Sequence, residues 1–422
     1  MARRSAAGAV GLAVAALTTS AMPAGAQTVA ITGATIYPVS GPKIERGTIV
    51  IRDGRIAAVG KDVAVPNGAT RIDGTGRWIT PGLIQSGTAL GLRLLESGGV
   101  DQTRENELAG EVTPAFNVAE GIDPASITLP VARLEGITST LGVPAAGLIP
   151  GQGAFFDLAG DRLEDMLAKS PAAMVIDVSE SAKSAAGGSR AGIMQRLRQV
   201  LRDAAEYERR KADYRRGQMQ PLSLPEADLQ ALQPVLRGEL PVLAKANRRS
   251  DIENALRLAK EFKLRLVIWG GVEAWQLAPA LAAARVPVVL EPLTDVPHFD
   301  ALGARLDNAT LLRAGGATVV IAEHDEANFR NLRQAAGNAV RNGLAWDDAL
   351  RAVTLGAAEA FGVADRYGSL EVGKVANVVV WTGDPFEFSS EAERVFIRGQ
   401  EMPRTSRQTE LRERYSTVPP KF

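Results

Sequence analysis

The middle of the chain alternates short apolar runs with longer stretches of helical periodicity. The apolar runs are rich in β-branched side chains and predict buried strands, whereas the periodic stretches predict helices. The predicted strands are 84–90, 173–178, 241–246, 265–269, 286–290 and 318–321, and the predicted helices are 192–216, 251–262, 273–284, 327–342 and 347–354. Strands that are apolar on both faces and alternate with helices favour a closed parallel β/α barrel.

Both ends of the chain show a different pattern, in which short strands are separated by turn residues. Asp53-Gly54 is a two-residue hairpin signal between two of the N-terminal strands. Strand-forming segments that enclose a long α/β region predict one discontinuous β-sandwich domain, built from both chain ends. The predicted N-terminal strands are 31–37, 47–51, 55–60 and 70–73, and the predicted C-terminal strands are 376–381 and 393–398. The expected parts are a β-sandwich at 27–79 and 366–405, a barrel at 80–365 and a tail at 406–422.

Residues 149–154, Ile-Pro-Gly-Gln-Gly-Ala, carry two glycines in a short apolar context. Glycines at this spacing favour a hairpin turn. The alternative is a loop whose backbone N–H groups bind an anion.

Charge and cysteine content exclude several classes of protein. Lys plus Arg equals Asp plus Glu, 48 against 48, so the sequence lacks the basic surplus of a nucleic-acid or anionic-membrane partner. There are no cysteines, which excludes disulfides, zinc–thiolate sites and cysteine nucleophiles.

The first 26 residues predict a secretory signal peptide. Arg3 and Arg4 precede the apolar stretch 6–17, and Ala24-Gly25-Ala26 offers a small-residue cleavage site before Gln27. A disordered alanine-rich tail is the alternative. We therefore expect an exported protein, periplasmic or secreted, without a membrane span after processing.

Two scaffold motifs carry a resemblance to a known family. The stretch 73–92 contains Pro81-Gly82-Leu83-Ile84, and 368–374 reads Gly-Ser-Leu-Glu-Val-Gly-Lys, followed by Asn377 where an aspartate is usual. Together with Leu129–Thr138, these motifs resemble the imidazolonepropionase-like group of the amidohydrolase (metallo-dependent hydrolase) superfamily. The resemblance implies a TIM-like (β/α)8 barrel, zinc as the usual cofactor and hydrolysis of C–N bonds other than peptide bonds.

The metal-binding histidines that this resemblance implies are mostly missing. The family motif Asp-x-His-x-His corresponds to Gln85, Ser86, Gly87, Thr88 and Ala89, and the two later histidines correspond to Lys245 or Asn247 and to Gly270. The whole chain contains two histidines, His298 and His324. Paired-metal sites need several imidazole and carboxylate ligands. We therefore expect no metal ligands and no cofactor.

Active sites of β/α barrels lie at the C-terminal ends of the strands. His324 there is either a functional residue, as a ligand or general base, or a structural one, whereas His298 is expected in a loop. Lys245 either forms an ion pair with Glu291 or Asp325 or acts as a general base or Schiff-base lysine. This rule selects as catalytic candidates Asp325, His324, Glu323 and Lys245, and as substrate-binding candidates Gln85, Thr88, Asn247 and Glu291.

Three hypotheses of function follow. The first is an exported amidohydrolase-like hydrolase with a degenerate or absent metal centre. The second is a non-catalytic barrel that binds a small ligand, forms a homo-oligomer or pairs with an active amidohydrolase. The third is metal-free hydrolase or lyase chemistry at His324 and the neighbouring carboxylates.

Overall fold

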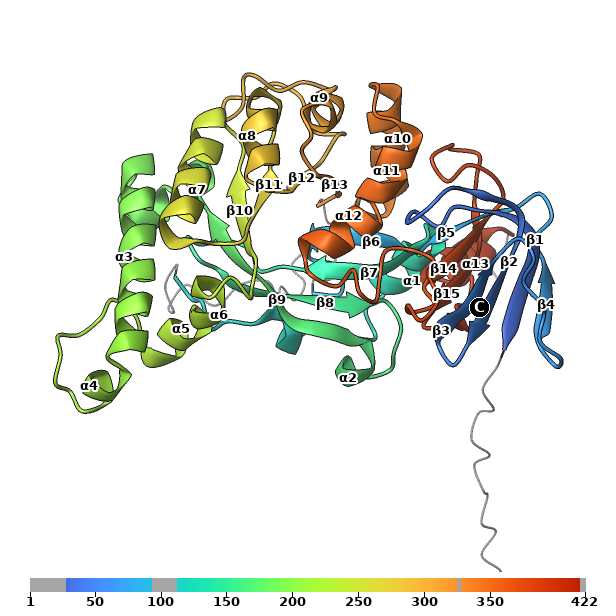
Figure 1. The fold of residues 1–422 in the computed structure, drawn as a ribbon, viewed down its shortest axis with the longest axis horizontal. Coiled ribbons are helices and arrows are strands. Elements are labelled where there is room, and N and C mark those ends of the chain that lie inside the picture. Colours follow the sequence, from blue (N-terminus) through green and yellow to red (C-terminus); the bar gives the residue numbers. More distant parts are fainter. Residues whose placement is uncertain (1–27, 93–111, 325–327, 418–422) are drawn as a thin grey trace, which may run out of the picture.

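The computed structural model of the protein describes residues 28–92, 112–324 and 328–417. It contains two eight-stranded sheets, one at each side of the molecule in Figure 1. The larger part is a barrel covered by helices, and the smaller part is a sheet domain that both ends of the chain enter. The predicted signal peptide and the candidate Asp325 lie outside the described residues.

The small sheet has the order β16-β15-β14-β5-β1-β2-β3, with β4 paired to β1. Asp53 and Gly54 have φ values of 51° and 74°, which confirms the hairpin turn between β2 and β3. Isoleucines and valines from both chain ends share one core, among them Ile31, Ile49 and Val378. Its strands are β1 (Val29–Ile36), β2 (Ile44–Arg52), β3 (Arg55–Gly60), β4 (Thr70–Asp73), β5 (Trp78–Pro81), β14 (Val378–Trp381), β15 (Ala392–Ile397) and β16 (Gln400–Glu401).

The large sheet forms a nearly closed, TIM-like barrel, which confirms the predicted fold class. Its order is β13-β12-β11-β10-β9-β8-β7-β6, and six of its strands run in the direction of β6. The strands are β6 (Leu83–Thr88), β7 (Ile137–Gly142), β8 (Gly151–Asp157), β9 (Leu167–Asp177), β10 (Val242–Ala246), β11 (Leu266–Gly270), β12 (Val288–Leu290) and β13 (Val319–Ile321).

One strand, β8, departs from the predicted all-parallel arrangement. It pairs antiparallel with both β7 and β9, so the prediction of a hairpin turn at 149–154 is wrong. Its glycines serve close backbone approach instead. A Cβ at Gly151 would lie 2.4 Å from the Phe116 carbonyl oxygen, and one at Gly153 would lie 2.8 Å from the Gly142 carbonyl oxygen. Glycine is required where another backbone approaches a strand this closely.

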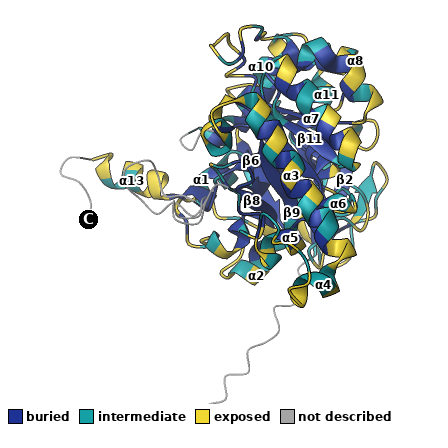
Figure 2. Ribbon diagram, turned by 90° about the vertical axis from the view of Figure 1, so that its left-hand side faces the viewer, coloured by how far each residue is buried: buried dark blue, intermediate teal, exposed yellow. Residues whose placement is uncertain are grey.

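Helices cover the outside of the barrel and leave its strands buried, as Figure 2 shows. The predicted helix 192–216 divides at Arg210 into α3 and α4, and the predicted helix 273–284 begins as a 3-10 turn. The α-helices are α1 (Thr128–Leu134), α2 (Leu163–Met166), α3 (Arg190–Arg209), α4 (Lys211–Arg215), α5 (Glu226–Ala231), α6 (Gln233–Leu236), α7 (Arg249–Phe262), α8 (Ala278–Ala283), α9 (Asn308–Ala314), α10 (Leu332–Arg341), α11 (Trp346–Ala352), α12 (Leu355–Ala360) and α13 (Arg407–Tyr415). The 3-10 helices are η1 (Val118–Gly121), η2 (Glu180–Ala182), η3 (Ser184–Ala186), η4 (Ala274–Leu277) and η5 (Phe329–Asn331).

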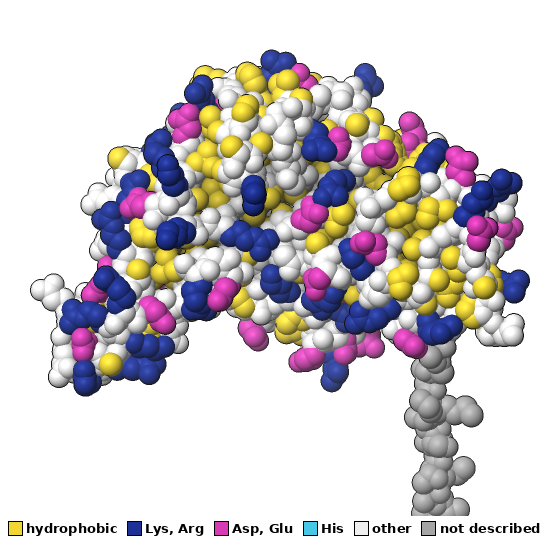
Figure 3. All heavy atoms as spheres, viewed as in Figure 1, with side chains coloured by type: hydrophobic (Ala, Val, Ile, Leu, Met, Phe, Trp, Pro, Cys, Tyr) yellow, Lys and Arg dark blue, Asp and Glu magenta, His cyan; other side chains and the backbone are white. Residues whose placement is uncertain are grey.

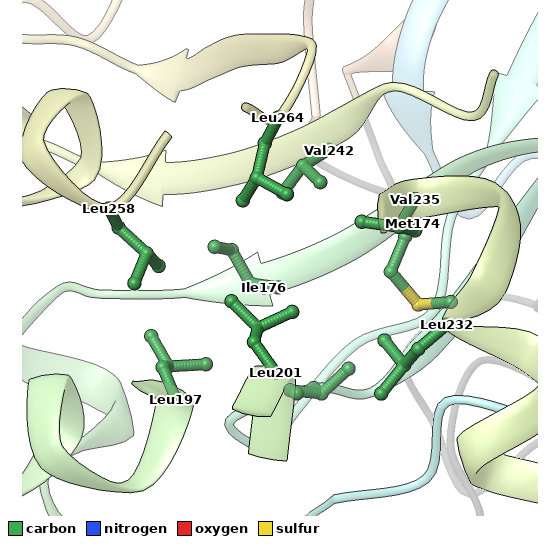
Figure 4. A pocket seen from close by; sticks show the side chains of 10 residues that line it. Met174, Ile176, Leu197, Leu201, Leu232, Val235, Val242, Leu258 and Leu264 are labelled. Atoms are coloured by element: carbon green, nitrogen blue, oxygen red, sulfur yellow. The ribbon is translucent and has the colours of Figure 1, made fainter. Parts of the chain in front are cut away.

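A small cavity with an apolar lining lies between β9, β10 and the covering helices α3, α6 and α7. Figure 4 shows Met174 and Ile176 of β9 facing Leu197 and Leu201 of α3 across this cavity of about 10 Å³. A space of this size holds at most one water molecule, and an apolar lining keeps it dry. The layer between these strands and helices is therefore packed core and not a ligand site.

Charged side chains on the surface are largely paired. Arg198 and Arg202 of α3 both bind Glu261 of α7, at 2.7 and 3.2 Å, so part of the basic charge of α3 is paired within the molecule. Acidic and basic side chains alternate on the face shown in Figure 3. Among the described residues, no helix has the length and apolar character needed to cross a membrane.

Candidate active site at the barrel mouth

The C-terminal ends of β9 to β13 bring several predicted residues together at one end of the barrel. Lys245 lies near the end of β10, Glu291 directly follows β12, and His324 follows β13. The same rule places Trp269 of β11 and Asp177 of β9 at this end, although the sequence analysis singled out neither.

His324 lies between an acid and an indole. Its Nε2 is 2.8 Å from Glu291 Oε1, and the side chains of His324 and Glu291 are 15% and 21% exposed, so both retain access to solvent. The indole Nε1–H of Trp269 donates to the same Nε2 of His324. The two rings are nearly perpendicular, at 86°, with centroids 4.8 Å apart. The imidazole is therefore held in one orientation by residues from two other strands.

The imidazole of His324 occupies space that Gly87 leaves open. A Cβ at Gly87 would lie 3.2 Å from His324 Cε1 and 3.5 Å from the Trp269 indole, and Gly87 has a φ of +79°. Gly87 stands where the family motif has its first histidine. A side chain there would meet both rings, so His324 and Trp269 fill this part of the mouth.

Burial, together with the positive charge of Lys245, lowers the pKa of His324 to about 3, and the Gly87 backbone opposes this shift only in part. Burial disfavours the charged imidazolium because it removes water that would solvate the charge. His324 is therefore a neutral imidazole at neutral pH.

Among the described residues, Lys245 pairs with Asp177 and not with the predicted partner Glu291. Its Nζ is 3.8 Å from Asp177 Oδ2 and donates to Ser181 Oγ at 3.2 Å, whereas Glu291 Oε1 lies against His324 Nε2. The predicted pairing of Lys245 with Glu291 is thus corrected, because β9 and β10 are direct neighbours and place Asp177 beside Lys245. Asp177 also accepts hydrogen bonds from the hydroxyls of Ser179 and Ser181, both at 2.6 Å.

The side chain of Asn247 lies where a side chain at position 270 would have to lie. A Cβ at Gly270 would lie 2.2 Å from Asn247 Oδ1, and the φ of Gly270 is +94°. Gly270 corresponds to another histidine position of the family motif. The Asn247 side chain therefore takes the room that a ligand at position 270 would need.

Gln85, a predicted substrate-binding residue, is fully buried in the seam that closes the barrel. Its Oε1 accepts a hydrogen bond from the Glu323 backbone N–H at 3.0 Å, and its Nε2 donates to the Phe329 carbonyl at 2.8 Å. Thr88 is also buried, and its hydroxyl accepts from the Leu90 N–H at 3.3 Å. Gln85 thus links β6 to the end of β13, where no ladder of backbone hydrogen bonds joins the two strands.

Comparisons with known proteins find likeness in both sequence and fold. The sequence model of the Amidohydrolase family matches residues 302–402. An amidohydrolase from Thermotoga maritima has a similar structure, with a TM-score of 0.80 and 28% sequence identity, over 89% of this chain and 100% of that one.

These likenesses in sequence and structure support placement of the chain in the amidohydrolase superfamily.

Two curated members of this superfamily extend the likeness along the chain. The imidazolonepropionase of Polaromonas sp. is 26% identical over 402 residues, covering 85% of this chain and 86% of that protein. Amidohydrolase tasK of Hapsidospora irregularis is 25% identical over 388 residues, covering 84% of this chain but 39% of that longer protein.

The donor set at the mouth does not fit the zinc centre usual in the superfamily. In the parts of the chain that the structure describes, no group of three or more His, Asp or Glu side chains is arranged to hold a metal ion. Gly87 and Gly270 offer no donor atoms, Lys245 contributes a positive charge, and Asp177 already accepts from two serines. Among the described residues, a divalent cation would have to compete with these interactions for the His324 imidazole and the Glu291 carboxylate.

Proposed function

We propose that this protein is an exported hydrolase of the amidohydrolase superfamily that acts on C–N bonds other than peptide bonds with a degenerate or absent metal centre. The observation that carries the proposal is the contact of 2.8 Å between Glu291 Oε1 and His324 Nε2 at the open end of the barrel. The apolar and small-residue pattern of residues 1–26 supports export.

These residues can support attack of water on an amide or lactam carbonyl. The neutral imidazole of His324 accepts a proton from the attacking water, and Glu291 stabilises the resulting imidazolium. The positive charge of Lys245 stabilises the developing oxyanion. The C–N bond then breaks, and the imidazolium returns the proton to the leaving nitrogen.

The first experiment combines metal analysis with a substrate screen of the mature chain, tested on simple amides, lactams and N-acyl amino acids. We expect less than stoichiometric zinc, manganese or iron by elemental mass spectrometry. For any substrate that is turned over, His324→Ala should lower kcat by at least about 100-fold. The matched control is His298→Ala, because His298 lies in an exposed loop where its Nδ1 accepts from the Asp300 N–H.

Two outcomes would contradict this proposal. One metal ion or more per chain would mean that the protein binds metal through residues other than those described, and that the reaction uses this metal. Unchanged turnover in His324→Ala, with circular dichroism showing an intact fold, would exclude the imidazole as the base.

A second candidate function is a barrel that binds a small ligand without turning it over. The hydrogen bond from the Trp269 indole to His324 Nε2 favours it, because this nitrogen must be free to accept a proton during hydrolysis. The depressed pKa of His324 also makes it a weak base. Saturable binding of a substrate analogue without product formation, or purification in complex with an active amidohydrolase, would support this candidate over the first.

A further inference from the structure

A second cavity lies at the junction between the sheet domain and the barrel. It has a volume of about 370 Å³, within the range of small-molecule sites. None of the residues of the barrel mouth lines it. One wall is the segment that follows β1, and the other is α11, which lies beside the sheet domain in Figure 1. The lining residues are Tyr37, Val39, Gly41, Pro42, Lys43, Asp347 and Leu350.

Aromatic packing makes one wall of this junction cavity rigid. The ring of Tyr37 packs on Trp78 and Trp346, with centroid distances of 4.8 and 4.7 Å. The indole Nε1–H of Trp346 donates to Asp384 at 2.9 Å, which fixes that ring in turn. The position of Tyr37 is therefore set before any ligand arrives, which lowers the entropic cost of binding.

The backbone of the same wall, the segment that follows β1, is strained. Val39 has a φ of +71°, which β-branched residues rarely adopt because their Cβ branches collide with the backbone. Such strain persists only where the surrounding structure imposes it, and it is concentrated at ligand-binding segments. Val39 and Pro42 therefore form an apolar wall of defined shape opposite Leu350 of α11.

The electrostatics of the cavity favour a positive charge. Asp347 is exposed and makes no side-chain hydrogen bond or ion pair with the described residues, whereas Lys43 is paired with Glu45 at 3.2 Å. Burial, together with Asp384, Asp347 and Glu45, raises the pKa of Tyr37 to about 12. The ring face of a tyrosine attracts cations, and an unpaired carboxylate beside it adds to that attraction.

We propose that the junction cavity binds an organic cation, an amine or quaternary ammonium that carries a small apolar body. The apolar body contacts the Tyr37 ring and the wall formed by Val39, Pro42 and Leu350. The ammonium group pairs with Asp347. This site is separate from the barrel mouth, and the proposal does not depend on hydrolysis there.

The test is a titration of the full mature chain with three probes of one shape and different charge: benzylammonium, benzyl alcohol and benzoate. Calorimetry gives the affinity, and tryptophan fluorescence reports on Trp78 and Trp346 beside the cavity. We expect benzylammonium to bind roughly tenfold more tightly than benzyl alcohol, and benzoate to bind more weakly still.

Substitutions locate the binding. Asp347→Asn should weaken benzylammonium binding about tenfold and leave benzyl alcohol unchanged. Asp348→Asn is the matched control, because the neighbouring carboxylate pairs with Arg313 at 2.8 Å and does not line the cavity. Tyr37→Phe should retain binding, since the ring face is kept, whereas Leu350→Phe should block it by filling the space.

The proposal is overturned if the three probes bind with equal affinity, or if Asp347→Asn and Asp348→Asn have the same effect. Binding that is lost in His324→Ala but kept in Leu350→Phe would place the probe at the barrel mouth instead. If Leu350→Phe unfolds the protein, the Asp347 and Asp348 pair still decides the matter.

Discussion

Asp295 lies buried in the segment that follows β12, with half of its hydrogen-bonding capacity unused. Its Oδ2 accepts from Asn308 Nδ2 at 3.1 Å, and its Oδ1 makes no hydrogen bond within the described residues. Burial raises the pKa of Asp295 from its ordinary value of 3.8 to about 7. The folded protein therefore holds a proton that the unfolded chain releases, and the stability that Asp295 contributes is lost as the pH rises from about 4 to about 7.

At the residue scale, Asp295→Asn tests this linkage. We expect the variant to match the parent at pH 4 and to be about 2–4 kcal/mol more stable at pH 8, because the amide cannot ionise. Urea unfolding across this pH range measures the difference. Asp307→Asn is the control. Because Arg305 lowers the pKa of Asp307, replacing this carboxylate should not increase the free energy of unfolding as the pH rises. A pH-independent difference for Asp295→Asn would contradict the linkage.

At the element scale, β8 is a strand that the sequence pattern did not predict. Its glycines read as turn residues, yet Gly151 and Gly153 are there because other backbones pass within contact distance of them. The neighbouring strands β9 and β10 were predicted because their side chains are apolar, a property that is visible locally. Close backbone approach depends on two segments that are distant in the sequence, so no periodic pattern of residue types indicates it.

Gly151→Ala tests this explanation of β8. The new methyl group would meet the Phe116 carbonyl oxygen at 2.4 Å, in a backbone conformation with φ of +126°. We expect a loss of about 2–4 kcal/mol in the free energy of unfolding, from the clash and the strained dihedral together. Gly68→Ala separates the two causes, because Gly68 has a φ of +79° and no atom within 4 Å of its Cβ position. Equal losses at the two sites would show that the close approach at Gly151 contributes nothing.

At the scale of the whole molecule, the fully buried carboxylate of Asp157 joins the barrel to the sheet domain. Its Oδ1 accepts from Ser139 and from Asn377, both at 2.8 Å, and its Oδ2 accepts from Tyr367 at 3.0 Å and from Arg398 at 2.6 Å. Asn377 stands where an aspartate is usual in the superfamily. An amide suits this position because it donates to Asp157, whereas a second carboxylate would repel it.

Arg398→Met should destabilise the protein by about 3–5 kcal/mol, because it leaves the Asp157 charge buried without its cation. Adding Asp157→Asn to Arg398→Met should recover part of that loss. Arg394→Met is the control, with an expected change within about 0.5 kcal/mol, since its pair with Glu401 is exposed. Denaturant unfolding measures all of the variants. A small effect of Arg398→Met would mean that apolar contacts alone hold the two parts together.

The sequence by itself determined the alternation of strands and helices in the second half of the barrel, the joining of both chain ends in one domain and the small number of histidines. These features follow from side-chain type and periodicity, which are local. Tertiary structure alone decided that Lys245 pairs with Asp177, that His324 and Trp269 fill the space above Gly87, and that Gln85 closes the barrel instead of facing a substrate. It alone formed the cavity beside Tyr37. Each of these depends on which distant segments become neighbours, because a buried polar group takes whichever partner the fold brings within reach.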